Sequence, residues 1–171
     1  MNIQKLEERC LILENLIIST AEIYNKETTT NDQKALLETI IGAAIWYLPS
    51  GQELWTGKIS INALDYIKQG KSKGQLTKEH KYSRKQAGKQ LLTTKYKEFQ
   101  SRKIKLLDLY LHEYGKFNYV LKAENRQLVK FQKDTSFIDD KTAYQAAKIE
   151  LVQITYQELK MLSCGKDPKN F

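Results

Sequence analysis

The sequence DQKALLETIIGAAIWYL, residues 32–48, decides the fold class of this chain. Its second half is apolar on all sides, and such a helix is usually buried at the centre of a bundle. Thr30 or Asn31 supplies an N-terminal cap, and Pro49-Ser50-Gly51 ends the helix. The stretch therefore predicts a helical bundle around one buried helix.

Apolar periodicity and capping residues predict further helices on both sides of this stretch. Ser60 is the expected cap of one helix and Ser83 that of another. Three expected helices span residues 3–25, 61–69 and 141–162. Another begins at residue 84 and continues over residues 102–114.

One small β element is expected near residues 117–131. Phe117, Tyr119 and Leu121 alternate with polar residues, as in a half-buried strand, and residues 128–131 form a second short strand or a helical turn. Residues 52–58 are expected to be a connection that exposes Trp55. The predicted fold is mainly α, a bundle-like single domain over residues 1–171 with this small β element.

The composition excludes several classes of protein. Only two prolines and eight glycines occur in 171 residues, which favours long helices over a β-sandwich. The two cysteines lie near opposite ends of the sequence, so no zinc site is expected. The sequence has no phosphate-loop motif and no dinucleotide-binding motif, so no nucleotide cofactor is expected. The longest apolar run, residues 39–48, is shorter than the roughly 20 residues of a membrane span. The first residues do not have the pattern of a signal peptide, so we expect a cytoplasmic protein with no membrane contact.

The positive charge is concentrated in one segment. The chain has a net charge of +8, but residues 68–105 alone hold 13 basic and 2 acidic residues, a net charge of +11. We call residues 68–105 the basic segment. Such a segment predicts a polyanionic partner, with DNA more strongly expected than RNA.

Cationic and aromatic residues of the basic segment are the expected nucleic-acid contacts, with Tyr82 in place to stack on an exposed base. The predicted contacts are Lys71, Lys73, Lys78, Tyr82, Arg84, Lys85, Lys89, Lys95 and Arg102. The helix N-terminus at Ser83 adds free N–H groups that favour a phosphate.

The pair Glu79-His80, followed by Arg84-Lys85, resembles the opening of the HNH (ββα-metal) nucleases. The resemblance covers about seven residues. It implies that His80 is a general base, preceded by a metal-binding acid.

A second resemblance is to the PD-(D/E)xK nucleases, through Asp65 and the triplet Glu79-His80-Lys81. It implies that Asp65 and Glu79 bind Mg²⁺ or another divalent cation, and that Lys81 orients the attacking water. Glu79, His80 and Lys81 are thus the candidate catalytic residues. The same stretch also reads as a polar loop before a capped helix, which would bind without catalysis.

Three functions remain open at this point. The first is a metal-dependent endonuclease of the restriction or defence type, which cleaves phosphodiester bonds. The second is a non-catalytic DNA-binding protein whose helix after Ser83 lies at the major groove. The third is a basic inhibitor or adaptor for an acidic protein surface. A homodimer is compatible with each. The polar cluster around Glu124 is expected to have a capping role or to bring a second acid to the site.

Overall fold

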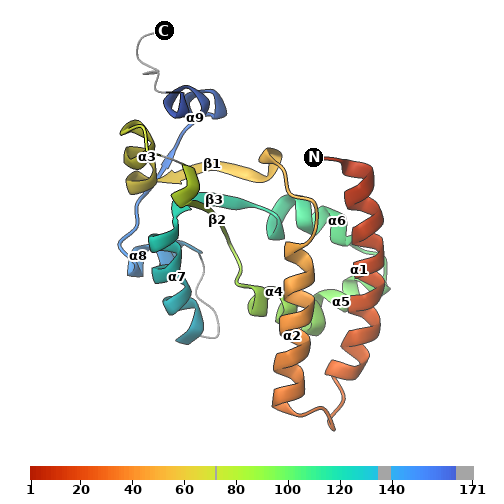
Figure 1. The fold of residues 1–171 in the computed structure, drawn as a ribbon. Helices are drawn as coiled ribbons and strands as arrows, with labels where there is room; N and C mark the ends of the chain where they lie inside the picture. Colours follow the sequence, from red (N-terminus) through yellow and green to blue (C-terminus); the bar gives the residue numbers. More distant parts are fainter. Residues whose placement is uncertain (72, 135–139, 165–171) are drawn as a thin grey trace. The chain divides into compact units, whose positions relative to one another are not determined.

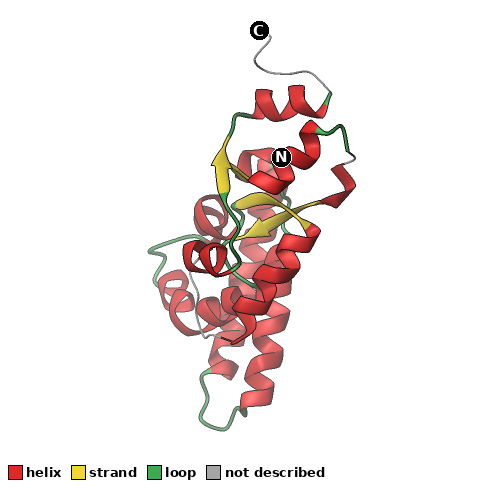
Figure 2. Cartoon of the chain, turned by 90° about the vertical axis from the view of Figure 1, so that its left-hand side faces the viewer, coloured by secondary structure: helices red, strands yellow, loops and turns green. Residues whose placement is uncertain are grey.

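Helices form most of the described chain, and four short strands form one sheet (Figures 1 and 2). The computed structural model describes residues 1–71, 73–134 and 140–164. The predicted fold class, mainly α with a small β element, is confirmed. Within these residues no helix is both long and apolar enough to cross a membrane.

The contacts divide the chain into two compact units, and each unit takes two separate stretches of sequence. Unit 1 consists of Met1–Leu54 and Lys81–Lys116. Unit 2 consists of Trp55–His80 and Phe117–Phe171. The basic segment is therefore shared between the two units, with its boundary between His80 and Lys81.

Unit 1 is built from helices. They are α1 (Ile3–Tyr24), α2 (Asn31–Trp46), the 3₁₀ turn η1 (Gln52–Leu54), α4 (Arg84–Gln90), the π-helical η3 (Leu91–Lys95), α5 (Tyr96–Gln100), α6 (Leu106–Leu109) and the π-helical η4 (Tyr110–Tyr114). The Thr30 side chain accepts a hydrogen bond from the Gln33 N–H, and Ser83 accepts one from the Gln86 N–H. Both predicted caps are confirmed. Each cap accepts a hydrogen bond from a backbone amide that has no partner within its helix.

The core of unit 1 forms where α2 crosses α4. A Cβ atom on Gly42 would lie 1.8 Å from the carbonyl oxygen of Arg84, and one on Gly88 would lie 2.0 Å from that of Glu38. Only glycine lets two helix backbones approach this closely. Ile41 and Ile45 are fully buried beside the crossing, so the stretch that predicted the bundle lies at its centre.

Unit 2 contains the sheet, in the order β2-β3-β1-β4. Strand β1 (Trp55–Ser60) pairs parallel with β3 (Phe117–Leu121) and antiparallel with β4 (Leu151–Gln153), and β2 (Leu76–His80) pairs antiparallel with β3. The other elements are α3 (Ile61–Lys68), the 3₁₀ turn η2 (Lys73–Gln75), α7 (Lys122–Asp134), α8 (Asp140–Ala146) and α9 (Tyr156–Ser163).

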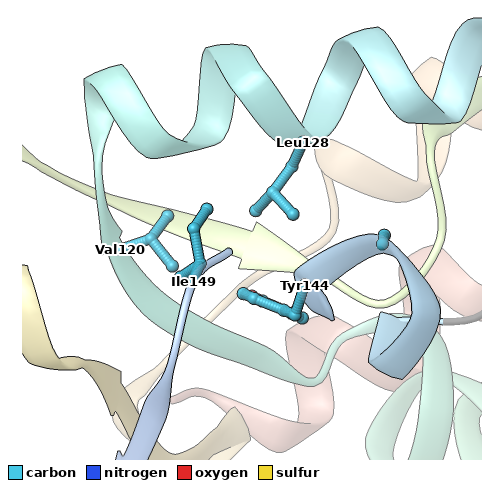
Figure 3. Close-up of a cluster of buried hydrophobic side chains, with 5 residues drawn as sticks. Val120, Leu128, Tyr144 and Ile149 are labelled. Atoms are coloured by element: carbon cyan, nitrogen blue, oxygen red, sulfur yellow. The ribbon is translucent and has the colours of Figure 1, made fainter. Parts of the chain in front are cut away.

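Helices cover both faces of the sheet. Successive residues of a strand point to opposite faces, so neighbouring residues pack against different helices. Val120 packs with residues of α7 and α8, and Figure 3 shows its side chain grouped with those of Leu128, Tyr144 and Ile149. The next residue on either side, Tyr119 or Leu121, packs on the second face with Ile59 and with helices α3 and α9. We call these the α7/α8 face and the α3/α9 face.

Two expectations about the β structure were wrong, and one open alternative is settled. Trp55 begins β1 instead of an exposed connection, and its indole N–H donates to the Lys58 carbonyl at 2.7 Å. Residues 76–80 form a strand, β2, and not a polar loop. Residues 128–131 belong to α7, so the helical alternative holds there.

The expected last helix, 141–162, is two helices separated by β4. Helix α8 ends before Lys148, whose φ of 54° is incompatible with a continuing helix. Thr155 then caps α9 and accepts a hydrogen bond from the Glu158 N–H. The apolar spacing is the same in one helix as in two, so periodicity alone did not reveal the break.

Candidate nucleic-acid interface

Glu79 lies on β2 and is only 6% exposed. Its carboxylate accepts a hydrogen bond of 2.7 Å from the Tyr144 hydroxyl. That hydroxyl accepts one from the Asn118 amide at 3.2 Å, and Asn118 in turn accepts one from the Thr56 hydroxyl at 2.5 Å. This polar chain satisfies a carboxylate that would be costly to bury alone.

His80 points to the other face of the sheet. It is opposite Phe117 in the β2–β3 register, and the two ring centroids are 5.9 Å apart. Phe117 is next to Tyr119 on the α3/α9 face, whereas Glu79 contacts Tyr144 on the α7/α8 face. The structure therefore does not bring the Glu79 carboxylate and the His80 imidazole together.

The predicted metal ligands are also separated by the sheet. Asp65 lies on α3, is exposed, and is 3.7 Å from the Lys68 ammonium. Helix α3 covers the face opposite to the one from which Glu79 projects. Across the described residues, no group of three or more histidine, cysteine, aspartate or glutamate side chains is placed to hold a metal ion.

Glu124 has the capping role that was one of its two expected roles. It is buried in the first turn of α7 and accepts hydrogen bonds from the Leu121 N–H, the Ser60 hydroxyl and the Asn62 amide at 2.6–2.9 Å. A carboxylate near a helix N-terminus interacts favourably with the helix dipole. Glu124 thus holds the junction between β3 and α7.

Tyr82 is a core residue, and the prediction that it stacks on nucleic-acid bases is not supported. Its side chain is 7% exposed, its hydroxyl donates to Glu113, and its ring centroid is 5.3 Å from that of Tyr114. The local sequence holds a signal for this. Tyr82 precedes the Ser83 cap, and an apolar residue at that position usually packs onto the first turns of the helix.

The unit 2 part of the basic segment presents few cations. Lys71 lies 5.1 Å from the Tyr66 ring and Lys78 lies 4.6 Å from the Phe117 ring, within the range of cation–π attraction. Partial burial lowers the pKa of Lys78. The side chain of Lys73 lies outside the described part of the structure.

The unit 1 part is far richer in cations: residues 81–105 hold nine basic residues and one acidic residue, Glu98. Lys85 and Lys89 are one turn apart on α4 and both are exposed. Arg84 lies 5.9 Å from the Trp46 ring, and Lys81 lies 5.2 Å from the Tyr82 ring. Cations held over aromatic faces remain available to solvent and to phosphates.

Two of these cations have carboxylate neighbours. Lys95 pairs with Glu98 at 3.1 Å. Lys85 lies 3.9 Å from Glu38, while 65% of its side chain remains exposed. Arg102 follows α5 with a φ of 54° and is exposed. Since Glu98 is the single acid of the stretch, residues 81–105 keep a large positive excess.

Sequence reasoning missed Tyr144 as a partner of Glu79, and it missed Asn118 and Thr56, which continue the chain of hydrogen bonds. They come from α8, β3 and β1, so no local spacing in the sequence connects them. No family model, curated protein or solved structure matches the chain. The resemblances to nucleases thus depend on the short motifs quoted above.

Proposed function

We propose that unit 1 binds the phosphate backbone of duplex DNA through the exposed cations of residues 81–105. The observation that carries this proposal is the ratio of nine basic residues to one acidic residue in this stretch. Most of these side chains are exposed, in α4, in α5 and in the turn after α5. Lysine and arginine that replace condensed counterions on DNA supply most of non-specific affinity.

Duplex DNA is favoured over duplex RNA by shape. The cations follow a continuous helical stretch from α4 through η3 to α5. The major groove of B-form DNA admits an α-helix, whereas the deep and narrow major groove of A-form RNA does not. Lys85, Lys89 and Lys97 are the contacts we assign first, since all three are exposed on this stretch.

The proposed activity is binding and not cleavage at Glu79. The Glu79 carboxylate is engaged by Tyr144 and lies on the face opposite to His80, so the pair lacks the geometry of a metal-binding acid beside a general base. Plasmid DNA incubated with and without Mg²⁺ tests this. We expect no cleavage that depends on Glu79. Cleavage by the wild type that is lost in Glu79→Gln would restore the endonuclease hypothesis.

The binding test is fluorescence anisotropy of a labelled DNA duplex at increasing salt. We expect the logarithm of affinity to fall linearly with the logarithm of salt concentration, with a slope of about −0.9 per neutralised phosphate. The triple variant Lys85→Ala, Lys89→Ala, Lys97→Ala should reduce the magnitude of this slope by about 2.7.

A matched control removes three exposed lysines outside the basic segment: Lys58→Ala, Lys122→Ala, Lys130→Ala. Its net charge equals that of the first variant, so net charge alone would change both alike. Equal losses in the two variants would contradict the assignment of the site. A slope near zero for the wild type would reject phosphate binding and favour an acidic protein partner.

A further inference from the structure

Helices α1 and α2 lie side by side as an antiparallel hairpin in unit 1 (Figure 1), and large apolar side chains are exposed on this hairpin. We call six of them the hairpin face: Ile12, Leu16 and Ile23 from α1, Leu36 and Ile40 from α2, and Tyr47, which caps the C-terminus of α2. Each is between 46% and 80% exposed. Single exposed apolar residues are common, but a contiguous group marks an interaction surface.

The six residues lie on one side of the hairpin. In each helix the three positions are spaced i, i+4 and i+11, which places them within roughly 40° of one another at about 100° per residue. Arg9 lies on the same side of α1 as Leu16, and its guanidinium donates to the carbonyl of Tyr47, the C-terminal cap of α2, at 3.0 Å. The two stripes are therefore neighbours at this end of the hairpin, from which the two helices run side by side (Figure 1).

The hairpin face is large enough for a specific contact. Each stripe spans eleven residue-to-residue steps, or about 16 Å at about 1.5 Å per step, and neighbouring helix axes are about 8–10 Å apart. With side chains included, the face covers on the order of 500–700 Å². Two such faces in contact would bury about 1,000–1,400 Å², the lower end of the range of specific interfaces.

Charge limits which partner can cover this surface. None of the six residues is charged, and residues 1–54 hold four basic and eight acidic residues. With twice as many acids as bases, this part of the chain lacks the excess of lysine and arginine by which proteins bind a phosphate backbone or an anionic membrane. The occupant is therefore a protein surface that is itself apolar and uncharged.

We propose that the hairpin face binds the hairpin face of a second copy of this chain, to form a closed dimer. The two stripes have the same spacing on antiparallel helices, so a copy rotated by 180° places apolar residues against apolar residues along the whole contact. The copy meets both requirements of the surface, since its own hairpin face is apolar and uncharged. None of the basic residues in 81–105 belongs to the hairpin face, so their positive charge does not oppose the contact.

The test is sedimentation equilibrium of the full chain from low to high micromolar concentration. A reducing agent is present because Cys164 is exposed and would otherwise form disulfide-linked pairs. The weight-average mass should rise from 19.9 kDa towards twice that value. The double variant Ile12→Glu, Ile40→Glu should raise the dissociation constant at least about 100-fold, because it places one carboxylate in each apolar stripe of the contact.

Leu11→Glu is the matched control. Leu11 is next to Ile12 and is 61% exposed, but it faces another side of α1. This variant should dimerise like the wild type, and far-UV circular dichroism should show that both variants are folded. A wild-type mass that stays at 19.9 kDa overturns the proposal, as does equal dissociation by Leu11→Glu. Binding of the monomer to phosphatidylcholine vesicles, lost in the double variant, would instead assign the face to lipid.

Discussion

Arg102 and Lys148 are the two described residues other than glycine that have a positive φ, 54° in each case. Each is the second residue after the end of a helix, α5 or α8, at a position where glycine is usual. The Ile149 N–H donates to the Tyr144 carbonyl at 2.9 Å, and the Lys103 N–H donates to the Glu98 carbonyl at 2.9 Å, so both turns are closed by backbone hydrogen bonds. The left-handed conformation costs a residue with a Cβ atom about 1–2 kcal/mol.

Lys148→Gly should therefore raise the free energy of unfolding by about 0.5–1 kcal/mol, after allowance for the greater freedom of glycine in the unfolded chain. Urea denaturation followed by circular dichroism measures the change. Lys148→Ala is the control, since it removes the charge but keeps the strain, and it should give no gain. A loss of stability in the glycine variant would mean that the lysine side chain itself stabilises the turn.

The two cysteines should differ strongly in reactivity. Cys10 is buried in α1, and burial, followed by the charges of Glu14 and Glu7, raises the pKa of its thiol to about 12. Cys164 is exposed. Because the thiolate is the reactive form, Ellman's reagent near pH 8 should modify Cys164 rapidly and Cys10 only as unit 1 opens.

Cys164→Ser should remove the rapid phase, and denaturant should make both thiols of the wild type reactive. A rapid phase that persists in Cys164→Ser would show that Cys10 is accessible in the folded chain.

At the scale of elements, the crossing of α2 and α4 should tolerate no added carbon. Gly42→Ala and Gly88→Ala each insert a Cβ within 2.0 Å of a backbone oxygen, and backbone moves less easily than a side chain. Each variant should lower the free energy of unfolding by about 3 kcal/mol or more.

Gly70→Ala is the comparison. Gly70 has a positive φ but nothing lies within 4 Å of an added Cβ, so only strain of about 1–2 kcal/mol is expected. Thermal or urea unfolding ranks the three variants. Equal losses in all three would mean that the helices separate freely at the crossing.

The polar chain inside unit 2 gives a prediction about Glu79. Tyr144→Phe removes the hydroxyl that donates to the Glu79 carboxylate at 2.7 Å, and should cost about 2–3 kcal/mol because a buried carboxylate loses a donor. A double-mutant cycle with Glu79→Gln should show coupling between the two residues. Additive effects would indicate that Glu79 does not depend on Tyr144.

Most helices could be predicted from the sequence because their signals are local. The caps Thr30, Ser60 and Ser83 and the apolar spacing of α1 are written within one or two turns of chain. The strands were mostly missed, because their partners are distant in sequence: β1 pairs with β3 and β4, 60 or more positions away. Strand β2 reads Leu-Thr-Lys-Glu-His, and only its pairing with β3 explains why so polar a segment is extended.

At the scale of the whole molecule, the boundary between the units lies within the stretch that carried the functional hypothesis. Glu79 and His80 end a strand of unit 2, and Lys81 begins the second part of unit 1. No change in composition marks this point, since basic residues continue on both sides. The location of the positive charge could therefore be predicted from the sequence. That the side chains of Glu79 and His80 point to opposite faces became clear only from the pairing of β2 in the sheet.

The two units should respond differently to alkaline pH. In unit 1 burial is the largest cause that raises the pKa of Cys10, Tyr24 and Tyr110, each to about 12. The ordinary values are 9.0 for the thiol and 10.0 for the phenols. In unit 2 burial raises the pKa of Tyr119. Above the ordinary values the unfolded chain holds fewer protons than the folded chain, so stability falls as pH rises.

Unit 1 should therefore keep its full stability below about pH 9 and lose it progressively towards about pH 12, more steeply than unit 2. The chain holds two tryptophans, Trp46 in unit 1 and Trp55 in unit 2, so Trp55→Phe and Trp46→Phe each leave a reporter for one unit. The emission maximum during urea unfolding, measured at several pH values, gives the stability of each unit. The Trp46 transition should move to lower urea above about pH 10, ahead of the Trp55 transition. If both transitions move together at every pH, the two units unfold as one cooperative body and the buried thiol and phenols of unit 1 destabilise the entire chain.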